Sequence, residues 1–133
     1  MLCIKTQLKS STISGIGLFA DEPIKKGTIV WRYEPNLDIL LPKETVAKLS
    51  ESAQKQFYNY AFLDNTCGKY MLCGDDARFF NHSENPNCDD SEPNITIALR
   101  DLEKGEELTV DYKTFYGDFE NHPEIYSAIN IKS

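Results

Sequence analysis

The sequence predicts a mostly β protein, and three observations support that fold class. Short runs rich in Ile, Val, Thr and Tyr, bounded by turn residues, occur along most of the chain and are typical of strands. Only one longer segment shows helical periodicity. The length of 133 residues, 41% of them hydrophobic, supplies enough apolar material for one compact core. We therefore expect a single domain, residues 1–133, with one or two short helices.

Six runs have the composition of strands. Several combine β-branched and aromatic residues, and Gly, Pro, Asn or Asp interrupt the chain between them. The predicted strands are residues 2–8, 17–20, 28–33, 69–73, 94–100 and 107–112. We expect residues 69–73 to form a hairpin with residues 60–64, because residues 65–68 between them have the composition of a turn.

The helical region runs from Pro42 to about Tyr60. Leu49, Ala53, Phe57 and Tyr60 recur there at steps of four, four and three, which places them on one face of a helix. We expect that face to pack against the sheets.

Two segments repeat one pattern. Residues 23–30 and 101–108 each contain an apolar residue, then a charged turn that ends in Gly, then a predicted strand. Two copies are too few for a repeat architecture. The chain after Gly117 has weak periodicity, so residues 118–133 are expected to be a C-terminal tail that is partly ordered by docking.

Charge limits the choice of partners. Lys and Arg number 14 and Asp and Glu 21, which gives a formal net charge of −7. Such a surface repels nucleic-acid phosphates and anionic lipids, and it attracts a Lys/Arg-rich segment. The first ten residues lack the apolar core of a signal peptide, and no run approaches the length of a membrane span. We expect a soluble monomer or homodimer without direct contact with nucleic acid or membrane. The expected location is the cytoplasm, with a nuclear or host-targeted location as the open alternatives.

The four cysteines, Cys3, Cys67, Cys73 and Cys88, have irregular spacings. In a protein that is not exported they are expected to be free thiols. They lack the paired short spacings of a zinc site, so no metal is expected.

Residues 15–20, Gly-Ile-Gly-Leu-Phe-Ala, fit the pattern G-x-G-x-x-[G/A] of dinucleotide-binding folds. That pattern requires a helix that begins on the glycines, whereas Pro23 and Gly27 interrupt any helix here. The chain is also too short for alternating βαβ units. A glycine turn between two strands is the simpler interpretation of this segment alone.

Residues 78–83, Arg-Phe-Phe-Asn-His-Ser, place Asn81 beside His82. An Asn side chain has two N–H donors and an acceptor oxygen, so it can pair with the ammonium or carboxylate of a cofactor. Taken alone, the pair also fits a hydrogen-bonded turn.

Residues 107–112, Glu-Leu-Thr-Val-Asp-Tyr, end a predicted strand at Tyr112, and three further aromatic residues follow: Phe115, Tyr116 and Phe119. For any one of these aromatic rings, packing in the core is the ordinary role. The order and combination of the three segments are more informative than each segment alone.

With the three segments in this order, the chain resembles the SET-domain protein-lysine methyltransferases. Residues 15–17 are similar to that family's G-x-G, residues 78–83 to its R-F-[IFM]-N-H-S, and residues 107–112 to its E-[LI]-T-x-D-Y. The resemblance covers roughly residues 5–117, and it is closest to the minimal bacterial and viral members.

This resemblance implies a β-clip fold of small curved sheets, in which the segment ending at Tyr112 threads beneath the Asn81-His82 loop as a pseudoknot. It implies S-adenosylmethionine as cofactor and a lysine-containing protein or peptide as substrate, which enter from opposite faces. Tyr112 is the implied catalytic residue and faces the methyl group. The implied cofactor-binding residues are Ile16, Gly17, Arg78, Asn81, His82, Tyr112 and Tyr116, with Phe115 as the alternative to Tyr116 for stacking on the adenine.

The chain departs from the family pattern at three places. Members with a zinc-binding tail carry Cys where this chain has Glu84, and no Cys follows Cys88, so no zinc site is implied. Val110 stands where Phe or Tyr is common, and this leaves the number of methyl groups added open. Glu34-Pro35 replaces a common Gly-Glu, so no contact is carried over to Glu34.

Methyl transfer to lysine requires a neutral amine, yet free lysine has a pKa near ~10.4. A narrow apolar channel and a nearby sulfonium cation would both lower that pKa, and aromatic walls with carbonyl oxygens would hold the amine in line. No metal or general-base dyad is required. Two alternatives stay open: a SET-like module without turnover, and a non-enzymatic β-clip interaction domain. The joint presence of Asn81, His82 and Tyr112 favours the enzyme.

Overall fold

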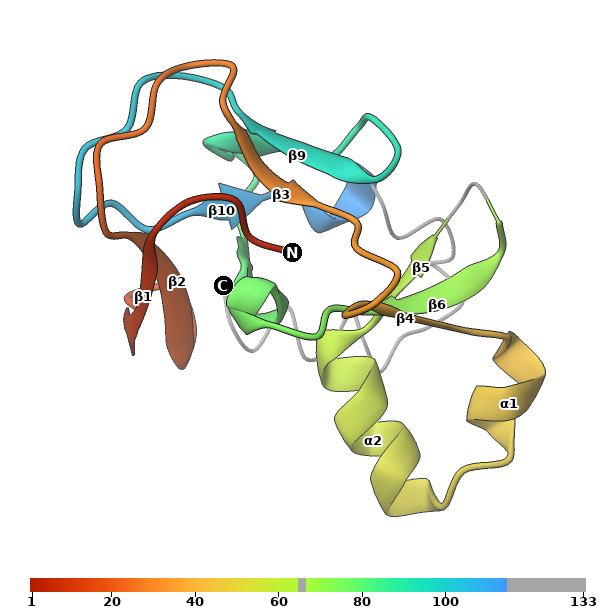
Figure 1. Ribbon diagram of the computed structural model, residues 1–133. Coiled ribbons are helices and arrows are strands. Elements are labelled where there is room, and N and C mark those ends of the chain that lie inside the picture. Colours follow the sequence, from red (N-terminus) through yellow and green to blue (C-terminus); the bar gives the residue numbers. More distant parts are fainter. Residues whose placement is uncertain (65–66, 115–133) are drawn as a thin grey trace.

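The predicted β-rich fold is confirmed by the computed structural model, which describes residues 1–64 and 67–114. Within these ranges the chain forms four small sheets, two α-helices and two 3₁₀ helices. Figure 1 shows the helices α1 and α2 together at one end of the molecule, beside the sheet that contains β4, β5 and β6. Among the described residues, no helix has the length and apolar character needed to cross a membrane.

The strands are short, and most follow the predicted runs. The strands are β1 Thr6–Ser10, β2 Ile16–Ala20, β3 Ile29–Arg32, β4 Ile39–Leu41, β5 Phe62–Asp64, β6 Lys69–Leu72, β7 Asn81–His82, β8 Cys88–Asp89, β9 Ile95–Ala98 and β10 Thr109–Val110. The helices are α1 Lys43–Ala47, α2 Glu51–Tyr60, η1 Asp76–Phe79 and η2 Tyr112–Thr114. The predicted first strand begins at Thr6, not at residue 2, and the predicted last strand keeps only β10 before η2 begins. Strands β4, β7 and β8 were not predicted.

The predicted helical region from Pro42 to about Tyr60 is confirmed, and two short helices occupy it. Ser50 has an extended backbone between them, and its side chain accepts a hydrogen bond from the N–H of Ala53. A serine in this position is a favoured N-cap, so it begins a new helix and ends the earlier one. Phe57 on the predicted face is buried, whereas Tyr60 is 39% exposed.

Two apolar clusters form the core. The larger one lies between β2, β3, β9 and β10, and Leu18, Val30 and Leu108 in it are fully buried. The smaller one packs α2 against the sheet of order β4-β6-β5 through Phe57 and Tyr70, whose rings meet edge to face at 5.8 Å. Each fully buried Leu, Val or Phe contributes about 1.5–3 kcal/mol to stability. The predicted hairpin of residues 60–64 with 69–73 is confirmed as β5 paired with β6.

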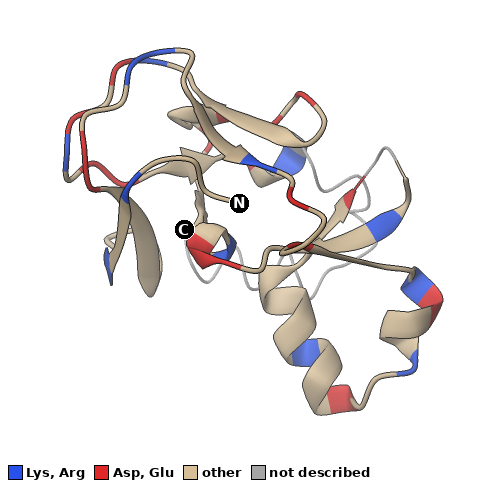
Figure 2. Ribbon diagram, viewed as in Figure 1, with Lys and Arg blue, Asp and Glu red and all other residues tan. Residues whose placement is uncertain are grey.

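The two segments with the repeated pattern lie against each other. Ile24 and Leu102 exchange two backbone hydrogen bonds, at 2.9 and 2.7 Å. Gly27 and Gly105 each donate to the strand that precedes the other copy, at 2.8 and 2.7 Å, and both have positive φ, which glycine adopts without strain. The repeat is therefore a pair of turns related by an approximate two-fold axis. Figure 2 shows residues of both charge signs along these paired turns.

The pseudoknot implied by the resemblance is present. Strand β10 lies parallel to β7, with Thr109 opposite Asn81 and Val110 opposite His82. Asn87 holds β10 from the other side, because its Oδ1 accepts from the N–H of Thr109 at 2.9 Å and its Nδ2 donates to the carbonyl of Glu107 at 2.8 Å. An asparagine side chain thus supplies the pairing that a further strand would supply.

Candidate active site

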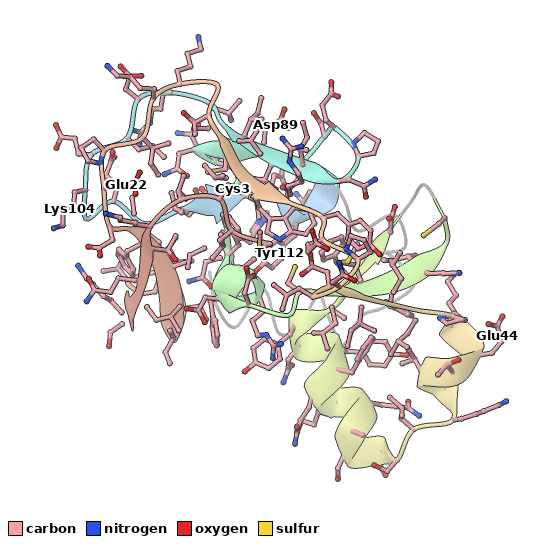
Figure 3. All side chains as sticks on the ribbon, viewed as in Figure 1. Cys3, Glu22, Glu44, Asp89, Lys104 and Tyr112 are labelled. Carbon is pink, nitrogen blue, oxygen red and sulfur yellow. The ribbon has the colours of Figure 1, made fainter. Side chains whose placement is uncertain are left out.

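Tyr112 is the residue around which the site is built. It begins η2 directly after β10, and its hydroxyl donates a hydrogen bond to the carbonyl oxygen of Phe80. Burial, with the negative charges of Asp90 and Glu107, raises the pKa of the Tyr112 hydroxyl well above its ordinary value. The hydroxyl therefore stays protonated. Figure 3 shows Tyr112 near the centre of the molecule.

His82 holds the backbone of Tyr112. Nδ1 of His82 accepts a hydrogen bond from the N–H of Tyr112 at 3.1 Å, and the two rings lie 5.4 Å apart. Burial lowers the pKa of His82, and the opposing effect of Asp111, with Oδ1 3.7 Å from Nδ1, is smaller. His82 is therefore neutral at physiological pH and carries its proton on Nε2.

The side chain of Asn81 connects the G-x-G turn to Glu107, which lies just before β10. Its Nδ2 donates to Oε2 of Glu107 at 2.7 Å, to Oγ of Ser11 at 3.1 Å and to the carbonyl of Ser14 at 3.2 Å. The Ser11 hydroxyl also donates to Oε1 of Glu107, at 2.7 Å. No hydrogen bond within the described residues reaches Oδ1 of Asn81, so this oxygen is an acceptor available to a ligand.

Gly17 is required by the position of Glu107. A Cβ at Gly17 would lie 2.3 Å from Oε2 of Glu107, so any larger residue would displace that carboxylate from Ser11 and Asn81. The side chain of Ile16 beside it is 52% exposed. Gly15 and Ile16 are exposed, whereas Gly17 is buried. Nδ2 of Asn81 lies 3.5 Å from the carbonyl oxygen of Ile16, and the acceptor Oδ1 of the same amide fits the ammonium of the predicted cofactor.

A cavity of about 170 Å³ has Tyr112 in its wall. Strands β3 and β9, the turn after β8, helix α2 and strands β5 and β6 all contribute to its lining. Aromatic residues make up much of its wall: Trp31, Tyr60, Phe62, Phe80 and Tyr112. Its acidic lining residues are Asp64, Asp90 and Glu92.

Arg78 lies with this cavity, whereas Asn81 and His82 are not among the residues that line it. Its guanidinium donates to the carbonyl of Cys73 at 2.8 Å and lies over the ring of Tyr60 at 5.7 Å. The structure thus joins Asn81 to the G-x-G turn and His82 to Tyr112, and it places Arg78 in the wall of the cavity that Tyr112 also lines. The cofactor contact expected of Arg78 stays a prediction. Tyr116 and Phe115, one of which is expected to stack on the adenine, lie outside the described residues.

The buried cysteines are poor nucleophiles. Burial raises the pKa of the Cys73 thiol far above its ordinary value and that of Cys88 to about 12, and nearby carboxylates reinforce both shifts. Both are free thiols. Within residues 1–64 and 67–114, no group of three or more His, Cys, Asp or Glu is placed to hold a metal ion.

Sequence reasoning missed Asp90, Thr96 and Trp31, which line the cavity. Asp89 and Asp90 are the same residue type side by side, so composition cannot tell which one the fold turns inward. The alternation along β9 does indicate that Thr96 is inward, because Thr96 and Ala98 are buried between partly buried neighbours.

The SET domain family matches residues 15–113. The chain is 34% identical over 113 residues to Histone-lysine N-methyltransferase trr of Drosophila melanogaster. That alignment covers 80% of the chain and 5% of the relative. It is 32% identical over 121 residues to Histone-lysine N-methyltransferase 2D of Homo sapiens, covering 84% of the chain and 2% of that protein. The chain therefore spans only a small part of these relatives.

A solved structure shares the fold. The crystal structure of a Plasmodium falciparum protein described as a putative histone methyltransferase superposes with a TM-score of 0.58. The alignment covers 82% of this chain and 93% of that one, at 20% sequence identity.

Proposed function

Because the chain belongs to the SET-domain family, we propose that it transfers a methyl group from S-adenosylmethionine to the ε-amine of a lysine in a protein substrate. One observation carries the proposal. The backbone of Tyr112 is hydrogen-bonded to His82, and the same residue lines an aromatic cavity. A group that lies between a cofactor pocket and a substrate pocket is placed to act where the two reactants meet.

S-adenosylmethionine, when bound, supplies an electrophilic methyl group on a sulfonium sulfur. Asn81 and the backbone of Ile16 and Gly17 would hold its amino-acid part. The amide donors of Asn81 are engaged by Glu107 and Ser11. This leaves Oδ1 of Asn81 as the acceptor that would pair with the cofactor's ammonium.

Tyr112 would position the amine. Its hydroxyl proton is directed to the carbonyl of Phe80, which orients the lone pairs of the hydroxyl oxygen as acceptors. A lysine amine that donates an N–H to this oxygen keeps its own lone pair for attack on the methyl group. The raised pKa of Tyr112 keeps the hydroxyl neutral, so it does not stabilise the ammonium form of the substrate.

The cavity suits a lysine side chain. Aromatic faces such as those of Trp31 and Tyr60 cover the methylenes and attract a cation, while removal from water lowers the pKa of the amine. The net charge of −7 favours encounter with a basic segment. Two similar relatives carry the name histone-lysine N-methyltransferase. We therefore take basic, lysine-rich protein segments of the histone-tail kind as the substrate class.

Incubation of the protein with S-adenosylmethionine labelled in the methyl group, together with core histones or a cell lysate, tests the proposal. We expect a labelled protein band and, in that band, methyl-lysine by mass spectrometry. Calorimetry with the cofactor alone separates the alternatives. Cofactor binding without a labelled protein would favour a SET-like module without turnover, and absence of binding by the folded protein would favour an interaction domain.

A further inference from the structure

Asp90 is a carboxylate at the cavity that contains Tyr112. It follows β8, and the hydroxyl of Thr96 on β9 donates a hydrogen bond to its Oδ1. This bond fixes the direction of the carboxyl group, because Thr96 itself is buried in the sheet. Asp90 and Thr96 both line the cavity. Figure 3 labels the neighbouring Asp89, which is the last residue of β8.

The charge of Asp90 is not balanced by a cation of the described chain. No lysine, arginine or histidine in residues 1–64 and 67–114 forms an ion pair with it. Arg78, the one Lys or Arg among the described residues that line the cavity, is directed to the carbonyl of Cys73 and the ring of Tyr60. A partly buried carboxylate without a cation costs stability, and such groups persist at sites where a ligand supplies the opposite charge.

We propose that Asp90 accepts the proton that the substrate lysine must lose before methyl transfer. This inference rests on the proposed methyltransferase function and names a residue outside the family's sequence pattern. Asp90 lines the same cavity as Tyr112, which we place beside the reacting amine. A positioned base at that point would first pair with the incoming ammonium and then receive its proton.

The proton transfer balances without another reactant. The carboxylate and the ammonium become a carboxylic acid and a neutral amine, as an O–H bond forms at Asp90 and an N–H bond of the substrate breaks. The net charge of the pair is zero before and after. In a cavity with little water the neutral pair is favoured over the ion pair, because two charges no longer need solvation. The freed lone pair of the amine is then available for attack.

Asp90 also has a pKa suited to this exchange. Burial raises it to about 6, against the opposing effect of the Thr96 hydrogen bond. Asp90 is therefore ionised near neutral pH and is a better proton acceptor than an exposed carboxylate. The titratable and charged groups around it are Asp64, Cys73, Arg78, Asp89, Glu92 and Tyr112.

The test compares Asp90→Asn with Asp89→Asn. Both remove one negative charge, and the amide introduced by Asp90→Asn keeps an acceptor oxygen for Thr96, but Asp89 does not line the cavity. Methylation of core histones, or of the purified protein labelled in the lysate, is measured from pH 6 to 10. We expect Asp90→Asn to lower kcat near pH 7 by on the order of 10²-fold. Its rate should recover toward high pH, where free lysine deprotonates by itself, while Asp89→Asn follows the wild type.

A second readout needs no substrate. Removal of an unbalanced buried charge should raise the melting temperature of the cofactor-free protein at pH 8 in Asp90→Asn and leave it nearly unchanged in Asp89→Asn. Three results would overturn the role of Asp90: a rate and pH profile equal to wild type, a change in KM alone, or a rate loss that high pH does not restore. A wild type that labels no protein would instead refute the methyltransferase function itself.

Discussion

The backbone N–H of Tyr112 donates a hydrogen bond to Nδ1 of His82 at 3.1 Å. The bond joins η2 to β7 across the pseudoknot, and it requires an unprotonated Nδ1. Protonation of His82 would replace this acceptor with a donor that faces the N–H of Tyr112. The position of Tyr112 therefore depends on the charge state of His82.

Stability should fall in acid because of this bond. The pKa of His82 is lowered in the folded protein, so the unfolded chain binds the proton more tightly. The contribution of His82 is fully present above the unfolded pKa of about 6.5 and is lost as pH falls below it. His82→Asn places an uncharged acceptor near Nδ1 and should remove this component. Melting temperatures of both proteins between pH 8 and 5 measure it.

His82→Phe is the matched variant for the hydrogen bond itself. It keeps a ring beside Tyr112 but leaves the N–H of Tyr112 without its acceptor, which should cost about 1–3 kcal/mol. We expect the order of stability at pH 8 to be wild type, His82→Asn, His82→Phe. Equal stability of the two variants would show that the ring, and not the hydrogen bond, holds η2.

Tyr112→Phe should separate the proposed catalytic role of the hydroxyl from its role in the fold. The ring stays, but the carbonyl of Phe80 loses its donor, so we expect a stability loss of about 1 kcal/mol. Turnover should fall on the order of 10²-fold or more, equivalent to about 2.7 kcal/mol, with nearly unchanged cofactor affinity. Methylation rate and melting temperature are measured on the same preparation.

Tyr58→Phe is the control for that experiment. Tyr58 packs edge to face on Tyr70 at 5.4 Å in the smaller cluster, away from the cavity lining. Loss of the Tyr58 hydroxyl should leave the methylation rate per folded molecule unchanged. If Tyr112→Phe methylates at the wild-type rate, Tyr112 has no catalytic role.

Gly17→Ala should weaken cofactor binding through a displaced carboxylate. The new Cβ would lie 2.3 Å from Oε2 of Glu107, so Glu107 must leave Ser11 and Asn81. Loss of these charge-assisted bonds should cost about 1.5–3 kcal/mol of stability, and calorimetry should show weaker binding of S-adenosylmethionine.

Gly15→Ala is the comparison within the same turn. Gly15 has a φ of +42° and no atom within 4 Å of its Cβ position, so the variant introduces backbone strain without a clash. We expect a cost of about 1 kcal/mol. Adding Glu107→Ala to Gly17→Ala should restore part of the stability. The proposed clash is excluded if Glu107→Ala destabilises the Gly17→Ala variant by as much as it destabilises the wild type.

Asn81→Ala should weaken binding of S-adenosylmethionine roughly 10- to 150-fold, because the ammonium of the cofactor would lose an acceptor worth about 1.5–3 kcal/mol. Asn85→Ala removes an exposed asparagine from the same loop and should bind as wild type does. Calorimetry on both variants decides the matter, and equal affinities would remove Asn81 from the cofactor site.

The sequence was sufficient to predict that Asn81, His82 and Tyr112 belong to one site, since their order and spacing match a family pattern. It could not predict why position 17 requires glycine, or that Asp90 and not Asp89 lines the cavity. The need for glycine at Gly17 comes from a carboxylate 90 residues later in the chain. Asp90 differs from Asp89 only in the direction in which the fold places its side chain. By contrast, the break between α1 and α2 was readable at Ser50, where local N-cap chemistry outweighs the apolar spacing.

The threaded strand β10 makes the candidate site depend on a segment that is synthesised long after the strand it pairs with. Its partner β7 precedes it by almost thirty residues, and the turn that leads into β10 must also pair with residues near Ile24. Closing such long loops costs entropy before any contact repays it, so this step belongs late in folding. A nascent chain on the ribosome can form the hairpin of β1 and β2 early. Tyr112 can take its position only after residues 107–112 have emerged. A chain synthesised only as far as residue 106 therefore holds the G-x-G turn without the strand that pairs with β7.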